Sequence, residues 1–438
     1  MAVTQRGSWT GHAGFVLAAA GSAIGLGNVW MFPFRTGQHG GAAFVLAYAV
    51  AVLAVGIPLM VAEILIGRST RRNPVGAFRA LGGGGAWQLV GWLGVLTGLV
   101  ILSYYGVVAG WTVNYVLLSF SGGLFEGGEG SAGAVFEQLL SDVPRQIFWQ
   151  AVFMVGTTVV VARGIEAGIE RASKVLMPSL FVLVLILLGY SLNTDGAAQG
   201  LDFLLRPRFG ELGWDGALAA LGQAFFSLSL GMGAMITYGS YIDVQQSVAR
   251  SALLIAAMDT VLALMAGLVI FPLVFTYGLE PSAGPGLVFI TLPEAFRAMP
   301  ASGFFAVTFF SLLMFAALTS AISLLEVVVS FVIDEFGFSR RAASWGCGGG
   351  IFALGLPSVL VPGFLDQMDA VANNWLLPGG GLLIAIFAGW VLKRPVAEAG
   401  YGGGRRIGLG FSVWRWCLRY VAPIAVGVIL LQSTGALG

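Results

Sequence analysis

The chain has few of the residues that a soluble enzyme or a nucleic-acid-binding protein needs. Only 10% of its 438 residues are charged, whereas an average soluble domain has about 25%. So few charges cannot cover the surface of a water-soluble globule of this size. The 22 Lys and Arg residues are balanced by 21 Asp and Glu residues, so the chain also lacks the basic surface that binds nucleic acid.

Cysteine and histidine are equally scarce. Cys347 and Cys417 are the two cysteines, which excludes a disulfide framework and a thiolate metal site. His12 and His39 are the two histidines, too few for zinc chemistry. These absences do not exclude an enzyme, but they remove the commonest metal-dependent ones.

Hydrophobic residues and glycine are abundant instead. Hydrophobic residues make up 57% of the chain, and 65 residues are glycine; the mean hydropathy is +0.88. Much glycine in an apolar chain is typical of helices that pack closely in lipid. A β-barrel would alternate polar and apolar residues instead. We therefore expect an all-α polytopic membrane protein.

Apolar segments long enough to cross a bilayer recur along the whole chain. A membrane helix needs about 20 largely apolar residues. We predict eleven transmembrane helices at residues 13–34, 42–67, 88–118, 147–162, 173–191, 216–240, 248–277, 303–333, 342–361, 371–392 and 414–433. The Gly-rich, acidic segment 121–146 is expected to be an exposed extracellular loop, and the short apolar stretch 287–299 a helix or hairpin on the outer face.

The basic residues predict the orientation in the membrane. With a cytoplasmic N-terminus, 17 of the 22 Lys and Arg residues fall on the inside, as the positive-inside rule requires. The five that fall outside are Arg35, Arg145, Arg206, Arg208 and Arg297. We expect a multi-pass protein of the cell membrane, with the N-terminus inside and the C-terminus extracellular or periplasmic.

Two predicted spans carry the same interruption. The first contains GSAIGLGN at 21–28 and the sixth contains SLSLGMG at 227–233. Each glycine costs a helix about 1 kcal/mol relative to alanine, so Gly25, Gly27, Gly231 and Gly233 are expected to break the two helices. Unwound backbone in a bilayer is tolerated only where it lines a cavity. Spans one and six run in opposite directions, which is typical of an inverted-topology repeat with its binding site at the breaks.

Three carboxylates lie within predicted spans, where each costs about 2.5–3.5 kcal/mol. Asp259 could bind a hard cation, relay a proton, or be a buried hydrogen-bonded acid. For Glu63 and Glu326 we favour structural acids that bind the amides of the broken helices. Thr319 and Ser320 could contribute oxygen ligands to a cation, or simply bind carbonyls of their own helix.

Taken together, these features resemble the neurotransmitter:sodium symporter family, specifically its prokaryotic amino-acid transporters with the LeuT-type fold. The matching segments follow the family's order along nearly the whole chain. They are GSAIGLGNVWMFPFRTGQHGGAAF (21–44), GIPLMVAEILIGR (56–68), SYYGVVAGW (103–111), RGIEAGIERASKVLMPSLF (163–181), GQAFFSLSLGMGAMITYGSY (222–241), FITLPEAF (289–296) and FAALTSAISLLE (315–326). The resemblance implies a five-plus-five inverted repeat within a single transporter domain spanning 1–438. The first repeat would cover about 13–191, the second about 216–392, and 414–433 would be an extra span.

The resemblance also implies sodium-coupled symport of an amino acid by alternating access, with two Na⁺ ions, and the residues that bind them. The first sodium site would use Ala23, Asn28, Ser227 and Asp259, and the second Gly21, Ile24, Ala316, Thr319 and Ser320. The substrate site would use Ser22, Ala23, Gly25, Leu26, Gly27, Ile101, Tyr105, Phe226, Ser227, Ser229, Met232, Ser320 and Leu324. The gate residues would be Arg6, Trp9, Tyr241, Asp334 and Asp369, with Arg35.

This sequence departs from the family pattern in four respects. The outer-gate arginine of many members is Met31 here, and Arg35 lies one turn further along. Asp259 stands where many members have Asn, and Ala263 lacks the serine that helps chloride-dependent members hold their anion. A built-in carboxylate supplies the negative charge of chloride, so we predict chloride-independent transport. The sequence ends after eleven predicted spans, where many members have twelve.

The apolar pocket predicts a neutral, hydrophobic L-amino acid as substrate and no enzymatic activity. A monomer should suffice for transport, with membrane lipid as its surroundings. The alternative is a proton-coupled amino-acid transporter or exchanger of the same fold, in which Asp259 would titrate. A membrane-embedded enzyme lacks a nucleophile–base or metal constellation, and a non-transporting receptor stays open on sequence alone.

Overall fold

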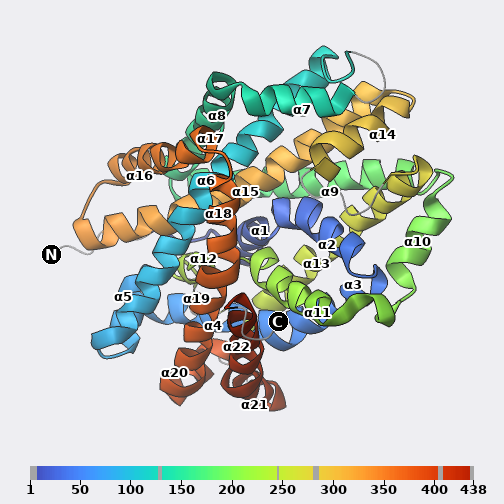
Figure 1. Cartoon of the computed structure of the whole chain (residues 1–438). Coiled ribbons are helices and arrows are strands. Elements are labelled where there is room, and N and C mark those ends of the chain that lie inside the picture. The colour runs from blue at the N-terminus through green and yellow to red at the C-terminus, as the bar shows by residue number, and fades with distance from the viewer. Residues whose placement is uncertain (1–6, 127–130, 244–245, 280–285, 403–407, 435–438) are drawn as a thin grey trace.

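The computed structural model describes residues 7–126, 131–243, 246–279, 286–402 and 408–434. These residues form helices and connecting turns, with no strand among them (Figure 1). The all-α prediction is therefore confirmed.

Nine continuous helical segments of the described chain are long and apolar enough to cross a membrane. Several contain a π-helical turn (η), a local widening common in helices that bend around a site. The segments are Ala42–Thr70 (α3 Ala42–Ala51, η2 Val52–Gly56, α4 Ile57–Thr70), Gly85–Ser121 (η3 Gly85–Trp87, a 3-10 turn, and α6 Gln88–Ser121), Val143–Ala162 (α8), Ile165–Ser191 (η4 Ile165–Glu170, α9 Arg171–Ser191), Val248–Thr276 (α13), Ser302–Phe336 (α15), Arg340–Leu360 (α16 Arg340–Gly355, α17 Pro357–Leu360), Phe364–Val391 (α18 Phe364–Val371, η6 Ala372–Leu376, α19 Leu377–Ile386, η7 Phe387–Val391) and Leu409–Ser433 (α21 Leu409–Trp416, η8 Cys417–Val421, α22 Ala422–Ser433).

The first predicted span is interrupted, as its glycines indicated. Helix α1 (His12–Ala23) ends before Ile24, and a second helical piece (η1 Gly27–Met31 with α2 Phe32–Gln38) follows at an angle of 52°. Counted as one span, this bent pair brings the described total to ten.

The sixth predicted span is interrupted more widely. Helix α11 (Phe209–Ser227) and the short helix α12 (Ala234–Gly239) are separated by the non-helical residues 228–233. Neither piece is by itself long and apolar enough to cross a membrane. The break is where the sequence placed it, and the count of eleven spans stays a prediction.

The connecting segments carry helices of their own. The stretch predicted at 287–299 is helical, as expected, and the segment predicted as an exposed loop at 121–146 is not simply a loop. It contains α7, whose Ala132, Phe136 and Leu139 are buried, because these apolar residues recur at helical spacing and pack inward. The connecting helices are α5 Pro74–Leu81, α7 Ser131–Ser141, α10 Ala197–Leu205, η5 Leu287–Thr291, α14 Leu292–Ala298 and α20 Arg394–Gly402.

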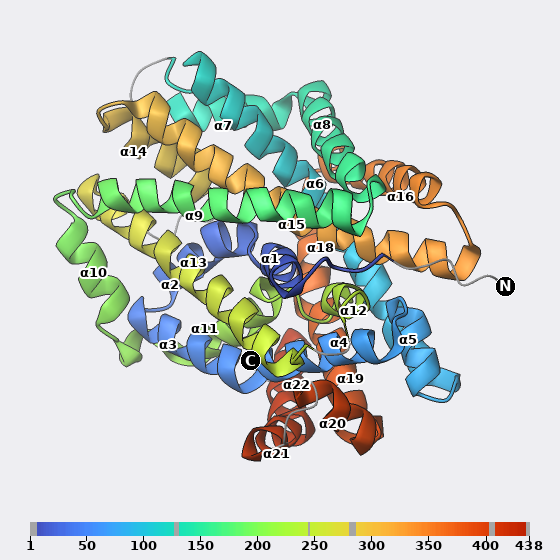
Figure 2. The same ribbon diagram turned by 180° about the vertical axis from the view of Figure 1, so that it is seen from behind.

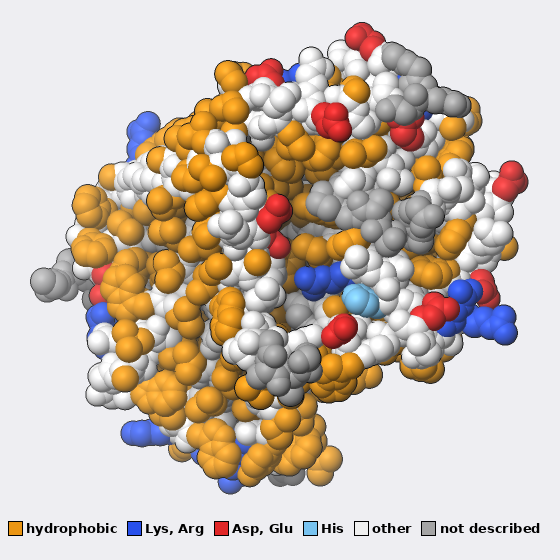
Figure 3. All heavy atoms as spheres, in the orientation of Figure 1, with side chains coloured by type: hydrophobic (Ala, Val, Ile, Leu, Met, Phe, Trp, Pro, Cys, Tyr) orange, Lys and Arg blue, Asp and Glu red, His pale blue; other side chains and the backbone are white. Residues whose placement is uncertain are grey.

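The two interrupted helices lie in the middle of the molecule. Helix α1 packs against α9, α13 and α15, and the long helices α6 and α15 pack along each other beside it. Both opposed views show α1 and α12 near the centre, with α19–α22 gathered at one end (Figures 1 and 2). Hydrophobic side chains cover much of the face seen in Figure 3, and many large hydrophobic residues are exposed, as expected for a surface in contact with lipid.

Candidate functional site

The break in the first span needs glycine for space rather than for backbone conformation. Neither Gly25 nor Gly27 has a positive φ angle, and Gly27 is the first residue of η1 rather than part of the break. A Cβ at Gly25 would lie 2.5 Å from Ser320 Oγ, and a Cβ at Gly27 would lie 2.7 Å from Phe226 Cδ1. The expectation that Gly27 unwinds the helix is therefore wrong, and its role is to let Phe226 approach.

The second break does require unusual backbone angles. Gly231 and Gly233 have φ angles of 80° and 76°, and Ser229 has a φ angle of 53°. Residues other than glycine rarely adopt positive φ angles of this size. Ser229 Oγ donates a 2.8 Å hydrogen bond to the Ser22 carbonyl of the first broken helix. The Gly231 N–H donates to Glu63 Oε1 at 2.8 Å, the structural role that we expected for Glu63.

A cluster of four buried polar side chains joins four helices beside the breaks. Asn28 Nδ2 donates to Asp259 Oδ1 at 2.7 Å and to Ser227 Oγ at 3.1 Å. Ser227 Oγ and the Tyr48 hydroxyl donate to Asp259 Oδ2 at 2.8 and 3.0 Å. All four side chains are at most 1% exposed. The carboxylate is thus held by hydrogen bonds, as a buried charge must be.

Hydroxyls of α15 meet carbonyls that the first break releases. Thr319 Oγ1 lies 3.5 Å from the Ile24 carbonyl and 3.0 Å from that of Ala316. Ser320 Oγ donates to the carbonyls of Ser22 and Ile24 at 3.2 and 3.4 Å. Thr319 Oγ1 also donates to the carbonyl of Phe315, four residues earlier in the same helix. The hydroxyl therefore contacts its own helix and α1 at the same time. Gly21 lies beside Thr319, because a Cβ added at position 21 would be 3.2 Å from Thr319 Cβ.

A small cavity lies between the breaks, and twelve of the thirteen residues predicted for the substrate site line it. Its volume is about 30 Å³, enough for one or two water molecules. An amino acid can enter only if the walls move. Ser227, the thirteenth predicted residue, belongs to the Asp259 cluster instead. The lining residues are Ser22, Ala23, Gly25, Leu26, Gly27, Ile101, Tyr105, Phe226, Ser229, Met232, Ser320 and Leu324.

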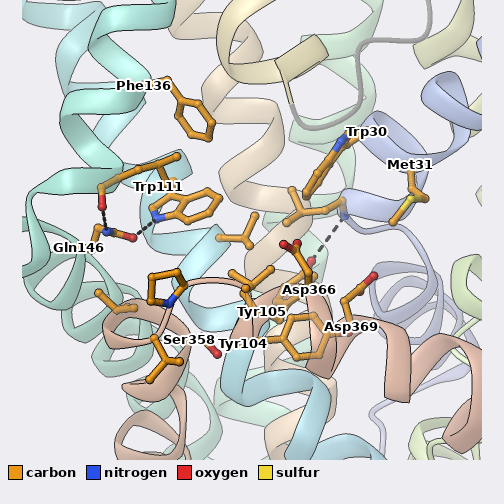
Figure 4. Close-up of a pocket in the computed structure, with 18 of the residues that line it drawn as sticks. Trp30, Met31, Tyr104, Tyr105, Trp111, Phe136, Gln146, Ser358, Asp366 and Asp369 are labelled. Carbon is orange, nitrogen blue, oxygen red and sulfur yellow. Dashed lines mark hydrogen bonds between the residues drawn. The ribbon is translucent and has the colours of Figure 1, made fainter.

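A much larger vestibule, of about 790 Å³, lies next to this cavity. Tyr105 and Phe226 line both spaces and so form the partition between them. In Figure 4, Trp30, Trp111 and Phe136 surround the vestibule together with Asp366 and Asp369. The Tyr105 hydroxyl accepts a hydrogen bond from the Leu26 N–H at 3.4 Å, which ties the partition to the first break.

The opposite side of the cavity is closed by aromatic packing. Trp9 is buried, its Nε1 donates to the Tyr238 carbonyl at 3.0 Å, and its ring lies 6.2 Å from that of Tyr241. Tyr241 donates to Glu326 Oε1 at 2.7 Å, and Glu326 forms an ion pair with Arg340. Glu326 therefore binds a hydroxyl and a guanidinium, not the broken-helix amides that we expected.

The remaining predicted gate residues lie on both sides. Asp334 accepts two hydrogen bonds from Asn73 at 3.0 Å near the closed side, and Arg6 lies outside the described residues. Arg35 and Asp369 both line the vestibule. Arg35 Nη1 donates to the Ala219 carbonyl at 3.3 Å, and Asp369 Oδ1 accepts from Asn373 at 2.9 Å.

Two site residues were not found from the sequence. Tyr48, on α3, is the fourth member of the Asp259 cluster, and Gln223 Nε2 donates to the Gly27 carbonyl at 3.0 Å. A tyrosine and a glutamine in apolar helices carry no local signal that separates a site residue from ordinary packing. Among the described residues no three His, Cys, Asp or Glu side chains are arranged to hold a metal ion.

A buried site between two interrupted helices, with a vestibule on one side and aromatic packing on the other, is typical of a membrane transporter. The comparisons specify the class. Residues 6–126 and 137–436 match the model of the "Sodium:neurotransmitter symporter family", and the chain belongs to this family, whose members are transporters rather than enzymes.

Individual relatives agree with the family assignment. The chain is 39% identical over 441 residues to the "Uncharacterized sodium-dependent transporter YhdH" of Bacillus subtilis (strain 168), covering 98% of each chain. It is 32% identical over 451 residues to an "Uncharacterized sodium-dependent transporter" of Haemophilus influenzae, again covering 98% of each chain. The crystal structure of MhsT in complex with L-phenylalanine superposes with a TM-score of 0.91 at 42% identity, covering 98% of this chain and 100% of that one. The inverted-repeat transporter fold is thereby confirmed, and the function is sodium-coupled transport across a membrane.

Proposed function

We propose that this protein is a chloride-independent symporter that couples the uptake of a neutral, hydrophobic L-amino acid to two sodium ions. The observation that carries the proposal is the convergence of the small cavity, the Asp259 cluster and the α15 hydroxyls on the two helix breaks. MhsT, which has the same fold, was crystallised with L-phenylalanine, and this supports an amino-acid substrate for the present chain.

The first sodium ion would bind at the Asp259 cluster. Ser227 and Asp259 lie within hydrogen-bond distance of each other and of Asn28 Nδ2, and Asn28 Oδ1 accepts from the Gly25 N–H at 3.1 Å. The oxygens of these three side chains and the Ala23 carbonyl would be the hard ligands that such a cation prefers. The substrate carboxylate would complete this site. Sodium and amino acid would then each bind better when the other is present, which is the basis of coupling.

The second sodium ion would bind between α1 and α15. The carbonyls of Gly21, Ile24 and Ala316 would act with the hydroxyls of Thr319 and Ser320, which already lie 3.0 to 3.5 Å from two of those carbonyls. An ion here would hold α1 against α15. It would thereby stabilise the arrangement that keeps the vestibule side open.

The amino acid would bind in an enlarged form of the small cavity. Its carboxylate would accept hydrogen bonds from the amides near Gly25–Gly27 and from the Tyr105 hydroxyl, as anions do at helix termini. Its ammonium would face the carbonyls of Ala23, Phe226 and Ser227. Apart from serines and the Tyr105 hydroxyl, the side chains of the lining are apolar, so a charged side chain would find no counter-charge, and flexible Met232 would adapt to different apolar shapes.

Asp259 would replace the chloride ion used elsewhere in the family. Its carboxylate would supply a negative charge beside the first sodium site, and Ala263, one turn later in α13, has no hydroxyl for an anion. We further propose the topology that the basic residues predict, with the vestibule facing outward, the Trp9 side cytoplasmic, and a monomer sufficient for transport.

The test is uptake by the purified protein reconstituted in liposomes, with the common amino acids screened in sodium and in potassium buffer. We expect uptake of hydrophobic amino acids that requires sodium and is unchanged when chloride is replaced by gluconate. Collapse of uptake in gluconate would disprove chloride independence alone, whereas failure of every hydrophobic amino acid would disprove the substrate class.

The same assay separates the proton-coupled alternative. If Asp259 exchanged protons with solvent during transport, uptake would proceed without sodium and would follow a pH gradient. Asn28, Tyr48 and Ser227 donate hydrogen bonds to the Asp259 carboxylate, and uptake that requires sodium and does not follow a pH gradient would support the sodium mechanism.

A further inference from the structure

A group of basic and aromatic side chains lies at the end of α19 and the start of the last span, apart from the transport site. Its basic members are Lys393 and Arg394, at the end of η7 and start of α20, and Arg415 and Arg419, on α21 and η8. Its aromatic members are Trp390, Trp416 and Tyr420, which are 54%, 57% and 44% exposed. We call these seven residues the basic–aromatic cluster. Figures 1 and 2 show its helices together at one end of the molecule.

The cluster is organised rather than a set of loose surface charges. Arg419 Nε donates to the Gly389 carbonyl at 2.8 Å, and its guanidinium lies 4.8 Å from the centre of the Trp390 ring. Arg415 Nη2 donates to the Leu392 carbonyl at 3.3 Å. The ring of Tyr420 lies 5.9 Å from that of Trp390 and 6.1 Å from that of Trp416. Two guanidinium groups are thus fixed beside a layer of aromatic rings.

The charge of the cluster is poorly balanced. Among the described residues, one ion pair involves a basic residue of the cluster. It joins Arg394 and Glu398 at 2.6 Å. Arg415 lies within electrostatic reach of the like charges of Arg419 and Arg394 as well as of Glu398, and its buried Nε has no hydrogen-bond partner in the described chain. A guanidinium has five N–H donors, and the backbone bonds above use one from each arginine. The remaining donors and the excess positive charge call for an anion.

The surroundings select the kind of anion. Exposed Trp and Tyr side chains are typical of the membrane–water interface, and Ile424, one turn beyond Tyr420 in the same span, is 66% exposed. An anion bound here therefore has an apolar surface directly beside it. Basic residues between membrane helices on the cytoplasmic side recognise anionic lipid headgroups in this way.

We propose that the basic–aromatic cluster is a binding site for the phosphate headgroup of an anionic phospholipid of the cytoplasmic leaflet. Arg415 and Arg394 contact the phosphate, Arg419 and Trp390 form one wall, and the acyl chains run from there along the exposed Ile424 toward the middle of the membrane. The bound lipid also steadies α20, whose Ala399 and Tyr401 carbonyls accept hydrogen bonds from Arg68 and Ser247 near the closed side of the transporter.

The test is native mass spectrometry of the purified, delipidated protein with equal amounts of phosphatidylglycerol and phosphatidylcholine of the same chain length. We expect preferential retention of phosphatidylglycerol, and a loss of roughly 30-fold in its affinity in the double variant R394Q/R415Q, since each basic residue near an anionic lipid contributes about 1 kcal/mol. The matched control is R171Q/R250Q, which removes two exposed arginines elsewhere and should leave retention unchanged.

Three outcomes would overturn the proposal: equal retention of the two lipids, full retention by R394Q/R415Q, or equal loss in the control. A further arm adds inorganic phosphate against sodium chloride of matched ionic strength. Displacement of the lipid by phosphate alone would show a site for free anions and not for lipid. If R394Q/R415Q does not fold, the variant K393Q/R394Q replaces it, because it changes only exposed side chains. We again expect the affinity for phosphatidylglycerol to fall about fivefold for each charge removed.

Discussion

At the scale of single residues, the site depends on the specific contacts of a few small or charged residues. Asp259 is held by Asn28, Tyr48 and Ser227, and Gly25 leaves the space that separates the first break from Ser320 and Tyr105. Both residues were identified from the sequence. The close approach that requires glycine at position 25 was not, because it joins segments about 300 residues apart.

Replacing Asp259 by Asn should weaken sodium binding. The variant keeps the size of the side chain but removes the charge, and interactions with a charged group contribute about 1.5–3 kcal/mol, so we expect the sodium concentration for half-maximal substrate binding to rise about tenfold or more. Binding of labelled amino acid at varied sodium concentration measures this. The control is Glu63→Gln, another buried carboxylate, which binds Gly231 rather than the Asp259 cluster; an equal effect in both variants would contradict the proposed ion site.

Replacing Gly25 by Ala should weaken substrate binding while the protein still folds. The added Cβ would lie 2.5 Å from Ser320 Oγ and 3.3 Å from the Tyr105 hydroxyl, and overpacking of this kind costs about 1–3 kcal/mol. We expect a loss of affinity of about 5- to 150-fold in the same binding assay. Gly11→Ala is the control, because a Cβ there meets nothing within 4 Å; normal binding by Gly25→Ala would place the substrate elsewhere.

At the scale of elements, hydrophobicity and glycine content predicted where helices lie and where two of them stop. The breaks at 24–26 and 228–233 fall on the predicted motifs, because a helix rich in glycine is weak wherever it is placed. Helix α7 was missed since its buried side chains, such as Phe136 beside Trp111 at 5.6 Å, show their role only when the vestibule is assembled. The segment that contains it reads as polar and rich in glycine.

Helix α9 offers a place where the closed side could open. Pro178 lies inside this helix, and an interior proline weakens a helix by about 3 kcal/mol because one backbone hydrogen bond is lost. In Pro178→Ala we expect release of sodium to the Trp9 side to slow by about tenfold, measured as efflux from loaded liposomes. Ser179→Ala, which removes only a hydroxyl bonded to the Val175 carbonyl, is the control; unchanged efflux in Pro178→Ala would remove the helix from the mechanism.

At the scale of the whole molecule, the vestibule of about 790 Å³ on one side and the buried Trp9 on the other describe a carrier with one side open. The cavity between them must connect to each side in turn for transport. Two sodium ions moving down 100 mV release about 4.6 kcal/mol. That energy supports an accumulation of a neutral substrate of about a thousandfold.

The number of coupled ions can be read from accumulation at zero membrane potential. With a tenfold inward sodium gradient, two ions per substrate predict accumulation of about a hundredfold, whereas one ion predicts about tenfold. Liposomes clamped with potassium and valinomycin, loaded with radiolabelled hydrophobic amino acid to a steady state, provide the measurement. A plateau near tenfold would rule out two-ion coupling and would leave one of the two proposed sites without a transported ion.

The amino-acid sequence was sufficient for those properties that each segment carries in itself. Transfer from water to lipid is a sum over the residues of one helix, so the spans, the two interrupted helices and the cost of a buried acid at position 259 follow from local composition. Hydrogen-bond partners are different, since they join residues far apart in the chain. Three sets of contacts exist only because the helices pack together, and so only the folded chain reveals them. They are the contacts of Tyr48 with Asp259, of Glu326 with Tyr241 and Arg340, and of Phe226 with Gly27.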